Sequence, residues 1–184
     1  MKASPVFTHL AAAAIVTMVI GLVYVAVQQN YRGGANEIQA QVATEICNRL
    51  QKNQSIEKLW PDDTIELTRS LRLFIELYDA NKQPVAPTAL LNGSIPKIPP
   101  GVMEIARINN ENRITWMPQS DVRMAMVVQH VNSPHAAYVA VGRSLKEVEM
   151  LEHNLLQMVF ICWIMCIGVI IIHFVIAQFL QKKQ

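Results

Sequence analysis

The sequence predicts an α+β fold, in which helices pack on one side of an antiparallel sheet and two transmembrane helices flank the domain. Residues 10–27 and 155–180 contain no Asp, Glu, Lys or Arg, and as helices they would extend over about 27 Å or more, enough to cross the apolar core of a bilayer. Between them, residues 28–154 hold short apolar segments separated by turn-forming residues, which is typical of successive hairpins. The sequence therefore predicts a central domain, two spans and short cytoplasmic segments at 1–9 and 181–184.

The composition excludes several classes of protein. Of the 184 residues, 52% are hydrophobic and only 16% are charged, which fits neither an ordinary soluble domain nor a disordered chain. The net charge of +2 is not concentrated in one region, so we expect no nucleic-acid partner. Three cysteines without a CxxC pair exclude a disulfide scaffold and a zinc ribbon. Phosphate-loop, metalloprotease and nucleophile-elbow motifs are also missing from the sequence, so we expect no enzyme activity.

The first apolar stretch is predicted to be a retained signal anchor. It is longer than the apolar core of a usual signal peptide, and no clean small-x-small cleavage site follows Val27. A cleaved signal peptide stays open as the alternative, because Lys2 precedes the apolar run. Lys2, Lys182 and Lys183 flank the outer ends of the spans and favour two cytoplasmic termini. The expected location is the inner membrane of a bacterium, with the central domain in the periplasm or at the cell surface.

An amphipathic helix is predicted directly after the first span. Gly33 and Gly34 can interrupt the helix, because glycine has a high entropic cost within a helix. The next apolar residues recur at every fourth position, at Ile38, Val42, Ile46 and Leu50. This stripe should pack on the domain or on the same helix of a second copy. A homodimer is expected, since paired helices would give two signalling arrangements a discrete geometry.

A second helix is predicted to run without a break into the second span. Ser144 and Glu147 have the spacing of a capping box, in which the hydroxyl accepts from the N–H of Glu147 and the carboxylate reaches back. Apolar residues then follow at helical spacing, at Leu145, Val148, Leu151 and Leu155. No Pro or Gly occurs before Gly168, so a displacement of the outer end would be carried through the membrane. The alternative is that both flanking helices are only connectors.

The central domain is predicted to contain one short helix and five strands. The helix is expected near residues 63–71, and a long proline-rich loop is expected over 86–101. The strands are expected at 73–78, 102–108, 113–117, 124–131 and 136–141, and the turn after residue 78 is expected to lead into the start of another strand at Val85. Because consecutive hairpins join neighbouring strands, the strands should form an antiparallel sheet.

Two motifs within this order resemble a known family. The Asp79-Ala80-Asn81-Lys82 turn and the Gly142-Arg143-Ser144-Leu145 junction, placed between two spans, resemble the extracytoplasmic input region of bacterial sensor histidine kinases. The outer domains of that family are often PAS-like, of the Cache type. The resemblance implies a sensory domain of a two-component system, which passes a signal through Gly142, Arg143, Ser144 and Glu147 into the second span.

The sequence departs from this family after the second span. A sensor kinase continues with a phosphoacceptor histidine and an ATP-binding domain, whereas only residues 181–184 follow here. We therefore expect a separate histidine kinase or another membrane signalling protein as the partner, or a chain that is part of a longer sensor. The competing hypothesis is a structural or accessory subunit of a membrane complex that binds no small molecule.

The resemblance also implies a small ligand held against the sheet. The polar and aromatic candidates for binding it are Tyr78, Arg107, Trp116, Arg123 and Tyr138. An arginine could hold a carboxylate or phosphate through two hydrogen bonds, and aromatic rings could form the apolar wall. The alternative is that these residues are core aromatics and solvated arginines.

Small residues in the spans predict contacts between helices. The candidate packing residues are Ala13, Thr17 and Gly21 in the first span and Cys162, Cys166 and His173 in the second. The last three share one face of an ideal helix, which would also suit a metal or haem. However, His173 lies about 10 Å along the axis from Cys166, too far for one metal to bridge them.

Other potential metal ligands are isolated in the sequence. His130 and His135 have no neighbouring cysteine or group of carboxylates, so we expect no metal and no cofactor in the domain. Cys47 is expected to be a small buried residue, and a disulfide between two copies of the chain stays open as the alternative.

Overall fold

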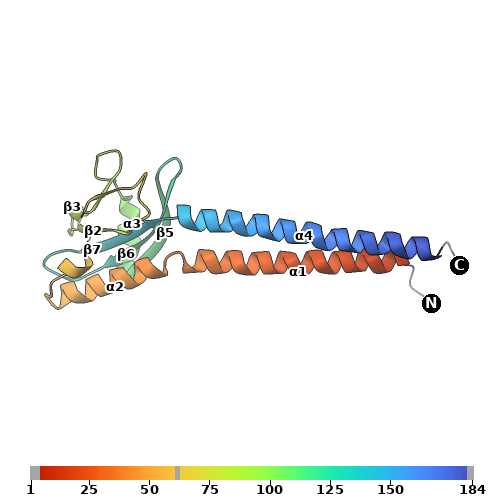
Figure 1. Cartoon of the computed structure of the whole chain (residues 1–184). Helices are drawn as coiled ribbons and strands as arrows, with labels where there is room; N and C mark the ends of the chain where they lie inside the picture. The colour runs from red at the N-terminus through yellow and green to blue at the C-terminus, as the bar shows by residue number, and fades with distance from the viewer. Residues whose placement is uncertain (1–4, 61–62, 182–184) are drawn as a thin grey trace. The chain divides into compact units, whose positions relative to one another are not determined.

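The computed structural model describes residues 5–60 and 63–181. The chain divides into two compact units, of which one comprises Arg32–Val148 and the other contains most of the two long helices α1 (Pro5–Gly34) and α4 (Lys146–Gln181) (Figure 1). The predicted tail at 182–184, with Lys182 and Lys183, and the N-terminal Lys2 lie outside the described residues.

Two helical segments are long and apolar enough to cross a membrane, one near the N-terminus and the other α4. Their most apolar windows bury none of their residues inside the protein. The helix α4 is continuous from Lys146 to Gln181, as predicted from the missing helix breakers. The predicted interruption at Gly33 and Gly34 is also confirmed, because α1 ends at Gly34 and α2 (Glu37–Gln51) begins three residues later.

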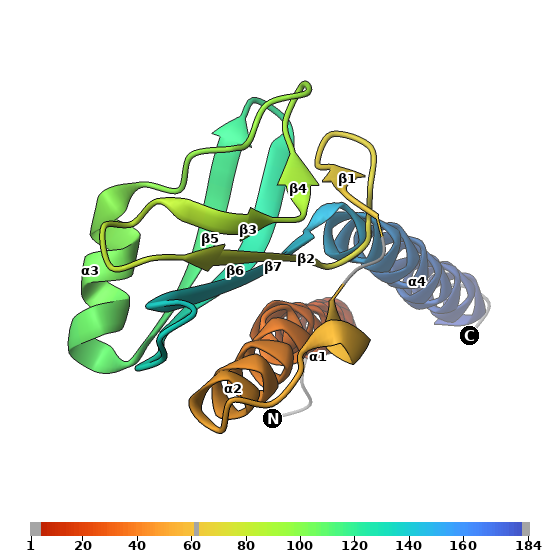
Figure 2. The same ribbon diagram turned by 90° about the vertical axis from the view of Figure 1, so that its left-hand side faces the viewer.

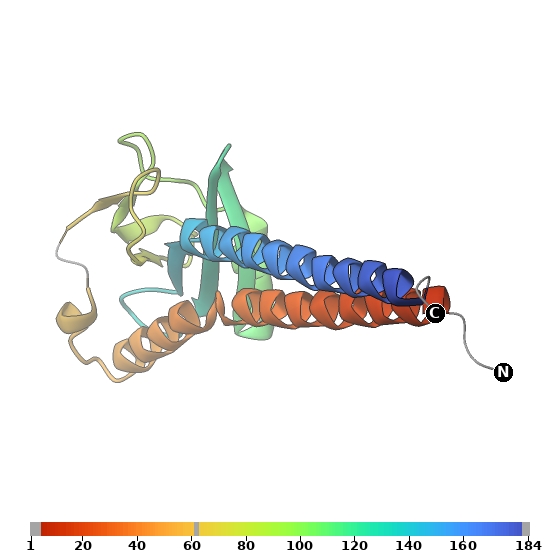
Figure 3. The same ribbon diagram turned by 45° about the vertical axis from the view of Figure 1, so that its right-hand side comes forward.

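The helices α1 and α4 lie side by side and exchange polar contacts (Figure 3). The indole N–H of Trp163 donates to the hydroxyl of Thr17 at 3.0 Å. That hydroxyl donates in turn to the carbonyl of Ala13 at 2.8 Å. Ring nitrogens of His9 and His173 lie 2.9 Å apart. Three of the six predicted packing residues therefore take part in contacts of α1 or between α1 and α4.

The domain is α+β and contains a five-stranded antiparallel sheet, as the sequence predicts. The strands lie in the order β3-β2-β7-β6-β5 and comprise β2 (Phe74–Tyr78), β3 (Pro84–Pro87), β5 (Glu111–Gln119), β6 (Val122–His130) and β7 (Tyr138–Ser144). Two short strands, β1 (Ile65–Glu66) and β4 (Ala89–Leu90), pair in parallel beside it. The strand β2 lies inside the sheet, between β3 and β7.

Both faces of the sheet are covered by helices (Figure 2). Side chains alternate along β2, so Ile75 and Leu77 pack with α2 on one face. Phe74 and Tyr78 pack on the other face, with the helix α3 (Pro100–Asn109). Every residue of β2 is consequently buried. The predicted stripe is corrected in one respect, because Ile38 is 51% exposed whereas Ile46 and Leu50 are buried against the sheet.

The prediction of a strand at 102–108 is wrong, because these residues form α3. Pro100 is compatible with the first turn of a helix, and the buried Met103 and Ala106 lie three positions apart, which places them on one helical face. Asn110 ends the helix in the left-handed conformation, with a φ of 65°. The apolar residues of this segment are thus spaced for a helix although their composition also suits a strand.

The prediction of a short helix at 63–71 is also wrong. The segment contains β1, followed by a turn at 67–69. The N–H groups of Ile65 and Leu67 donate to the carbonyls of Thr88 and Leu90, each at 2.8 Å. A helix would leave both buried apolar side chains without this partner strand, which lies more than twenty positions further along the chain. Between α2 and β1 the described residues form one short 3₁₀ turn, η1 (Glu57–Leu59).

Thr88 completes the hydrogen bonding of β2 where the neighbouring strand β3 ends in a proline. Its buried hydroxyl accepts from the N–H of Ile75 at 2.8 Å and donates to the carbonyl of Ile75 at 2.7 Å. We expect Thr88→Val to lower the free energy of unfolding by about 2 kcal/mol, because valine keeps the shape but leaves the buried N–H of Ile75 without an acceptor; the carbonyl of Ile75 keeps the backbone N–H of residue 88 at 3.2 Å. Denaturant unfolding of the full chain in detergent measures this loss. Thr88→Ser keeps the hydroxyl and should lose clearly less; equal losses would contradict the assignment.

Candidate functional site

The last strand of the sheet leads into α4 through one residue. The strand β7 ends at Ser144 and α4 begins at Lys146, so only Leu145 connects them. Leu145 is buried, and its N–H donates to the carbonyl of Arg123 on the neighbouring strand β6 at 2.9 Å. The connection is therefore part of the packed sheet, and the chain has no flexible loop at this point.

Arg143 ties the end of β7 to two other segments. Its Nε donates to the carbonyl of Leu71 at 3.1 Å, and a terminal guanidinium nitrogen donates to the carboxylate of Glu147 in the first turn of α4. The predicted capping box is corrected here, because Ser144 lies in the strand and its hydroxyl accepts from the N–H of Lys146 at 3.2 Å. The carboxylate of Glu147 pairs with Arg143 instead of reaching back to the backbone.

Gly142 is required by the packing of an aromatic ring across β7. Gly142 lies opposite Phe74 in the β2–β7 pair. A Cβ at this position would lie 2.3 Å from Cζ of Phe74, far inside van der Waals contact. Because Phe74 is fully buried, its ring has no open side to which it can move. The glycine predicted at the junction therefore serves the close approach of the ring to the backbone.

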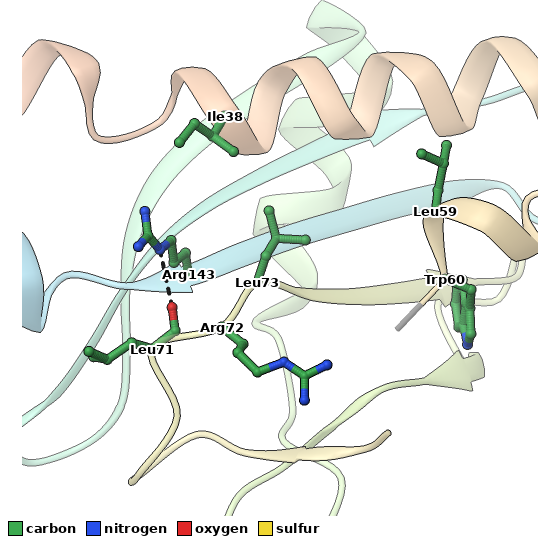
Figure 4. Close-up of a pocket in the computed structure, with 7 residues that line it drawn as sticks. All are labelled: Ile38, Leu59, Trp60, Leu71, Arg72, Leu73 and Arg143. Carbon is green, nitrogen blue, oxygen red and sulfur yellow. Dashed lines mark hydrogen bonds between the residues drawn. The ribbon is translucent and has the colours of Figure 1, made fainter. Parts of the chain in front are cut away.

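An open cleft lies beside Arg143 and has a volume of about 640 Å³. Its lining comes from α2, η1, the segment before β2 and the end of β7, and we call it the junction cleft: Ile38, Leu59, Trp60, Leu71, Arg72, Leu73 and Arg143 (Figure 4). Five of these side chains are apolar, and Arg72 is largely exposed, with Asp63 at 3.9 Å. Apolar walls with two guanidinium groups suit a ligand that has an anionic group and an apolar remainder.

The residues predicted to bind a ligand do not form one cavity. Tyr78, Trp116 and Tyr138 are buried in the hydrophobic core beneath α3. Arg107 is exposed and pairs with Glu104, while Arg123 lies on the exposed side of β6. The structure brings Tyr78 and Tyr138 directly opposite one another on β2 and β7. None of the five lines the junction cleft; their binding role stays a prediction.

Glu76 is the residue that sequence reasoning missed. It lies on β2 between Phe74 and Tyr78, and its side chain is fully buried. The hydroxyl of Tyr78 donates to Oε2, while Oε1 has no hydrogen-bond partner among the described residues. Burial raises the pKa of Glu76 to about 7, although the Tyr78 hydrogen bond acts in the opposite direction. The available signal was a lone carboxylate within an otherwise apolar strand.

The remaining predicted residues show no metal centre. Among residues 5–60 and 63–181, no group of three or more His, Cys, Asp and Glu side chains could hold a metal ion. Cys162 and Cys166 are free thiols on α4. Gly21 has no atom within 4 Å of a Cβ built on it, so it does not mediate close contact between α1 and α4 of one chain. Cys47 is buried as expected, and burial raises the pKa of its thiol to about 12.

Comparisons with known proteins give no family for this chain. No protein-family model matches it, and no curated protein matches it. Three features of the structure bear on function: the β7–α4 connection, the junction cleft and the buried carboxyl of Glu76.

Arg143 is expected to stabilise the connection. We expect Arg143→Ala to lower the free energy of unfolding by about 1 kcal/mol and to increase hydrogen exchange in residues 71–73, because the Leu71 carbonyl and Glu147 both lose their donor. Hydrogen exchange read by mass spectrometry on the full chain measures the effect. Lys146→Ala removes an exposed cation three positions away and is the control; matching exchange in the two variants would show that Arg143 does not hold this segment.

Proposed function

We propose that this protein is a two-pass membrane sensory module, with both termini in the cytoplasm and a PAS-like, Cache-type domain outside. The domain would respond to a ligand or partner and pass the change through its membrane helices to a separate signalling protein, such as a histidine kinase. A bacterial inner membrane and a homodimer belong to the same proposal. The direct β7–α4 connection carries it, since a change in the sheet reaches a long apolar helix without an intervening loop.

The order of the strands supports the PAS-like assignment. The first two and the last strand of the five are neighbours in the sheet, and a segment with one helix crosses between the second and the third strand. A helix precedes the sheet and covers one face, while α3 covers the other. The junction cleft supplies a place where a ligand would contact Arg143 and could favour one arrangement of the connection over another.

A second candidate function is that of an accessory subunit, in which the domain is a docking surface. Close packing of buried side chains beneath α3, where a small ligand was expected, favours it. Both candidates require that the central domain lies outside the cytoplasm. A single cysteine at Gln83 tests this topology, because Gln83 is exposed and lies in the turn before β3. A membrane-impermeant maleimide should label Gln83→Cys in intact cells; labelling only after lysis would contradict both.

Transmission through the spans separates the two candidates. Thr17 and Trp163 contact each other, so a Thr17→Cys/Trp163→Cys pair, in a chain whose native cysteines are alanine, reports the spacing of α1 and α4 through its rate of disulfide formation. A sensory module should change this rate severalfold when Arg143→Ala is added. The control is Arg72→Ala, which alters the same cleft without contact to α4 in the described structure. Equal rates in all three chains would favour the accessory subunit.

A further inference from the structure

Glu76 occupies a position that offers few hydrogen-bond donors. On β2 it lies opposite Pro87 of β3 and Ala140 of β7. Neither neighbour has a polar side chain, and Pro87 also has no N–H to donate. An ionised carboxylate has about four acceptor sites, whereas Glu76 receives one hydrogen bond, from Tyr78, within the part of the chain described. The neutral, protonated carboxyl therefore fits this site better than the charged form.

The strands around Glu76 supply no cation in contact with it. Tyr78 on the same strand is neutral at physiological pH, since burial and Glu76 both raise its pKa. Tyr138 lies opposite Tyr78 on β7, and the ring of His130 on β6 lies 5.4 Å from that of Tyr138. The strand β3 (Pro84–Pro87) has no titratable side chain.

The helix α3 carries charges that are already paired. Arg107 donates to Glu104 on the same helix, and Lys82 from the turn after β2 lies 3.4 Å from the same carboxylate. Both Arg107 and Glu104 are substantially exposed, and neither forms an ion pair with Glu76. The part of α3 that faces the sheet consists of the buried Met103 and Ala106. The other elements on the face of the sheet that α3 covers, β1 and β4, contribute the apolar Ile65 and Ala89. The carboxylate of Glu66 on β1 accepts from the N–H groups of Asn92 and Gly93. An ionised Glu76 would consequently face apolar groups.

We propose that Glu76 is a proton-binding site through which the domain responds to the pH of its surroundings. The protonated carboxyl remains buried, with α3 packed on the sheet. The ionised carboxylate draws water or a donor toward Oε1, and because β3 and β7 flank β2 within the sheet, these enter from the face that β4 covers together with α3. Loss of the proton therefore loosens the layer that β4 and α3 form over this face. That pH is a signal for this domain rests on the proposed sensory function. Proton binding by Glu76 can be tested separately.

The expected behaviour agrees with the burial of the group. Burial raises the pKa of Glu76 from 4.5 to about 7, so the proton is exchanged near neutrality. The strand β2 pairs with β7 along its whole length, and β7 continues through Leu145 into α4. Only one strand, β7, and one residue, Leu145, therefore lie between β2 and the long apolar helix α4.

The test compares hydrogen exchange of α3 and β2 at pH 6 and pH 8 in the full chain in lipid nanodiscs. After correction for intrinsic exchange rates, protection of α3 in the wild type should fall about tenfold or more at pH 8. Glu76→Gln imitates the protonated group and should keep its protection at both values. Glu104→Gln, which removes an exposed carboxylate from α3, is the matched control and should behave as the wild type. Equal protection at both values in the wild type would overturn the inference.

A second measurement does not depend on a variant that folds. In infrared difference spectra of the wild-type chain, the band of a protonated carboxyl should disappear as the pH rises through neutrality; a band lost only near pH 4 would overturn the inference. The disulfide pair at Thr17 and Trp163, measured at the same two pH values, then addresses the sensory function. A Glu76 that titrates without any change in disulfide rate would refute the sensory meaning and leave the proton site in place. If Glu76 does not titrate near neutral pH but the rate of disulfide formation still changes with Arg143→Ala, the proton site alone would be refuted.

Discussion

Gly142→Ala should destabilise the domain by about 2–3 kcal/mol, the largest effect expected from adding a single methyl group to this fold. The new Cβ would lie 2.3 Å from Cζ of Phe74, and the buried ring cannot move aside without displacing its neighbours in the core. The expected result is a lower midpoint with an unchanged slope in urea unfolding of the full chain, followed by circular dichroism.

The control and the rescue for this prediction come from the same chain. Gly101 lies in the first turn of α3 with no atom within 4 Å of a Cβ, so Gly101→Ala should be neutral or slightly stabilising. Phe74→Leu removes the part of the ring that a Cβ at Gly142 would meet. The double variant should therefore be more stable than the sum of the two single losses implies. Strict additivity would mean that the ring is not the obstacle.

The stability of the wild-type domain should fall by about 3 kcal/mol as the pH rises from 4.5 to 7, through the single group Glu76. In this window the unfolded chain releases the Glu76 proton, because its pKa there is the ordinary value, whereas the folded chain retains it. Ionisation then favours the unfolded state, until the folded state also loses the proton above pH 7. The stabilising contribution is thus fully present below pH 4.5 and is lost through pH 7. Denaturant unfolding at half-unit pH steps measures the slope.

Glu76→Gln should remove the fall in stability between pH 4.5 and 7 and leave the pH dependence outside this range unchanged. The ionisation of other carboxyls changes the stability in the opposite direction and at lower pH. The N–H of Asn92 lowers the pKa of Glu66, and a hydrogen bond from Arg113 lowers that of Glu111, so their contributions are lost only as the pH falls below about 4.5. An unchanged slope between pH 4.5 and 7 in Glu76→Gln would assign the effect to a different group.

The parts of the fold that follow from local periodicity could be predicted from the sequence. Their apolar residues repeat with the period of a helix or a strand, or form an uninterrupted run. This holds for the two long apolar helices, for the amphipathic α2 and for the hairpins around β2, β5, β6 and β7. Failures occurred where the partner lies far along the chain. The strand β1 exists because β4 pairs with it. The apolar composition of α3 suits a strand as well as a helix and conceals its helical spacing.

The site could be predicted only in part. The junction residues Gly142 and Arg143 were found because they lie at a change from a strand to a helix pattern. Their roles depend on the tertiary structure, since the ring over Gly142 and the Leu71 carbonyl beside Arg143 belong to segments about 70 positions earlier. Glu76 was missed because an acidic residue in a strand ordinarily faces solvent, and only burial on both faces of β2 overrides this rule.

The complete burial of β2 also has a consequence for the newly made chain. Before folding, the segment Phe74–Tyr78 is a run of large apolar and aromatic residues, the kind of sequence that associates with copies of itself. In that state Glu76 is solvated, keeps its ordinary pKa and carries a negative charge in the middle of the run. Ionisation of Glu76 is costly in the folded sheet. In the unfolded chain the same charged side chain acts as a gatekeeper against aggregation until the sheet forms around it.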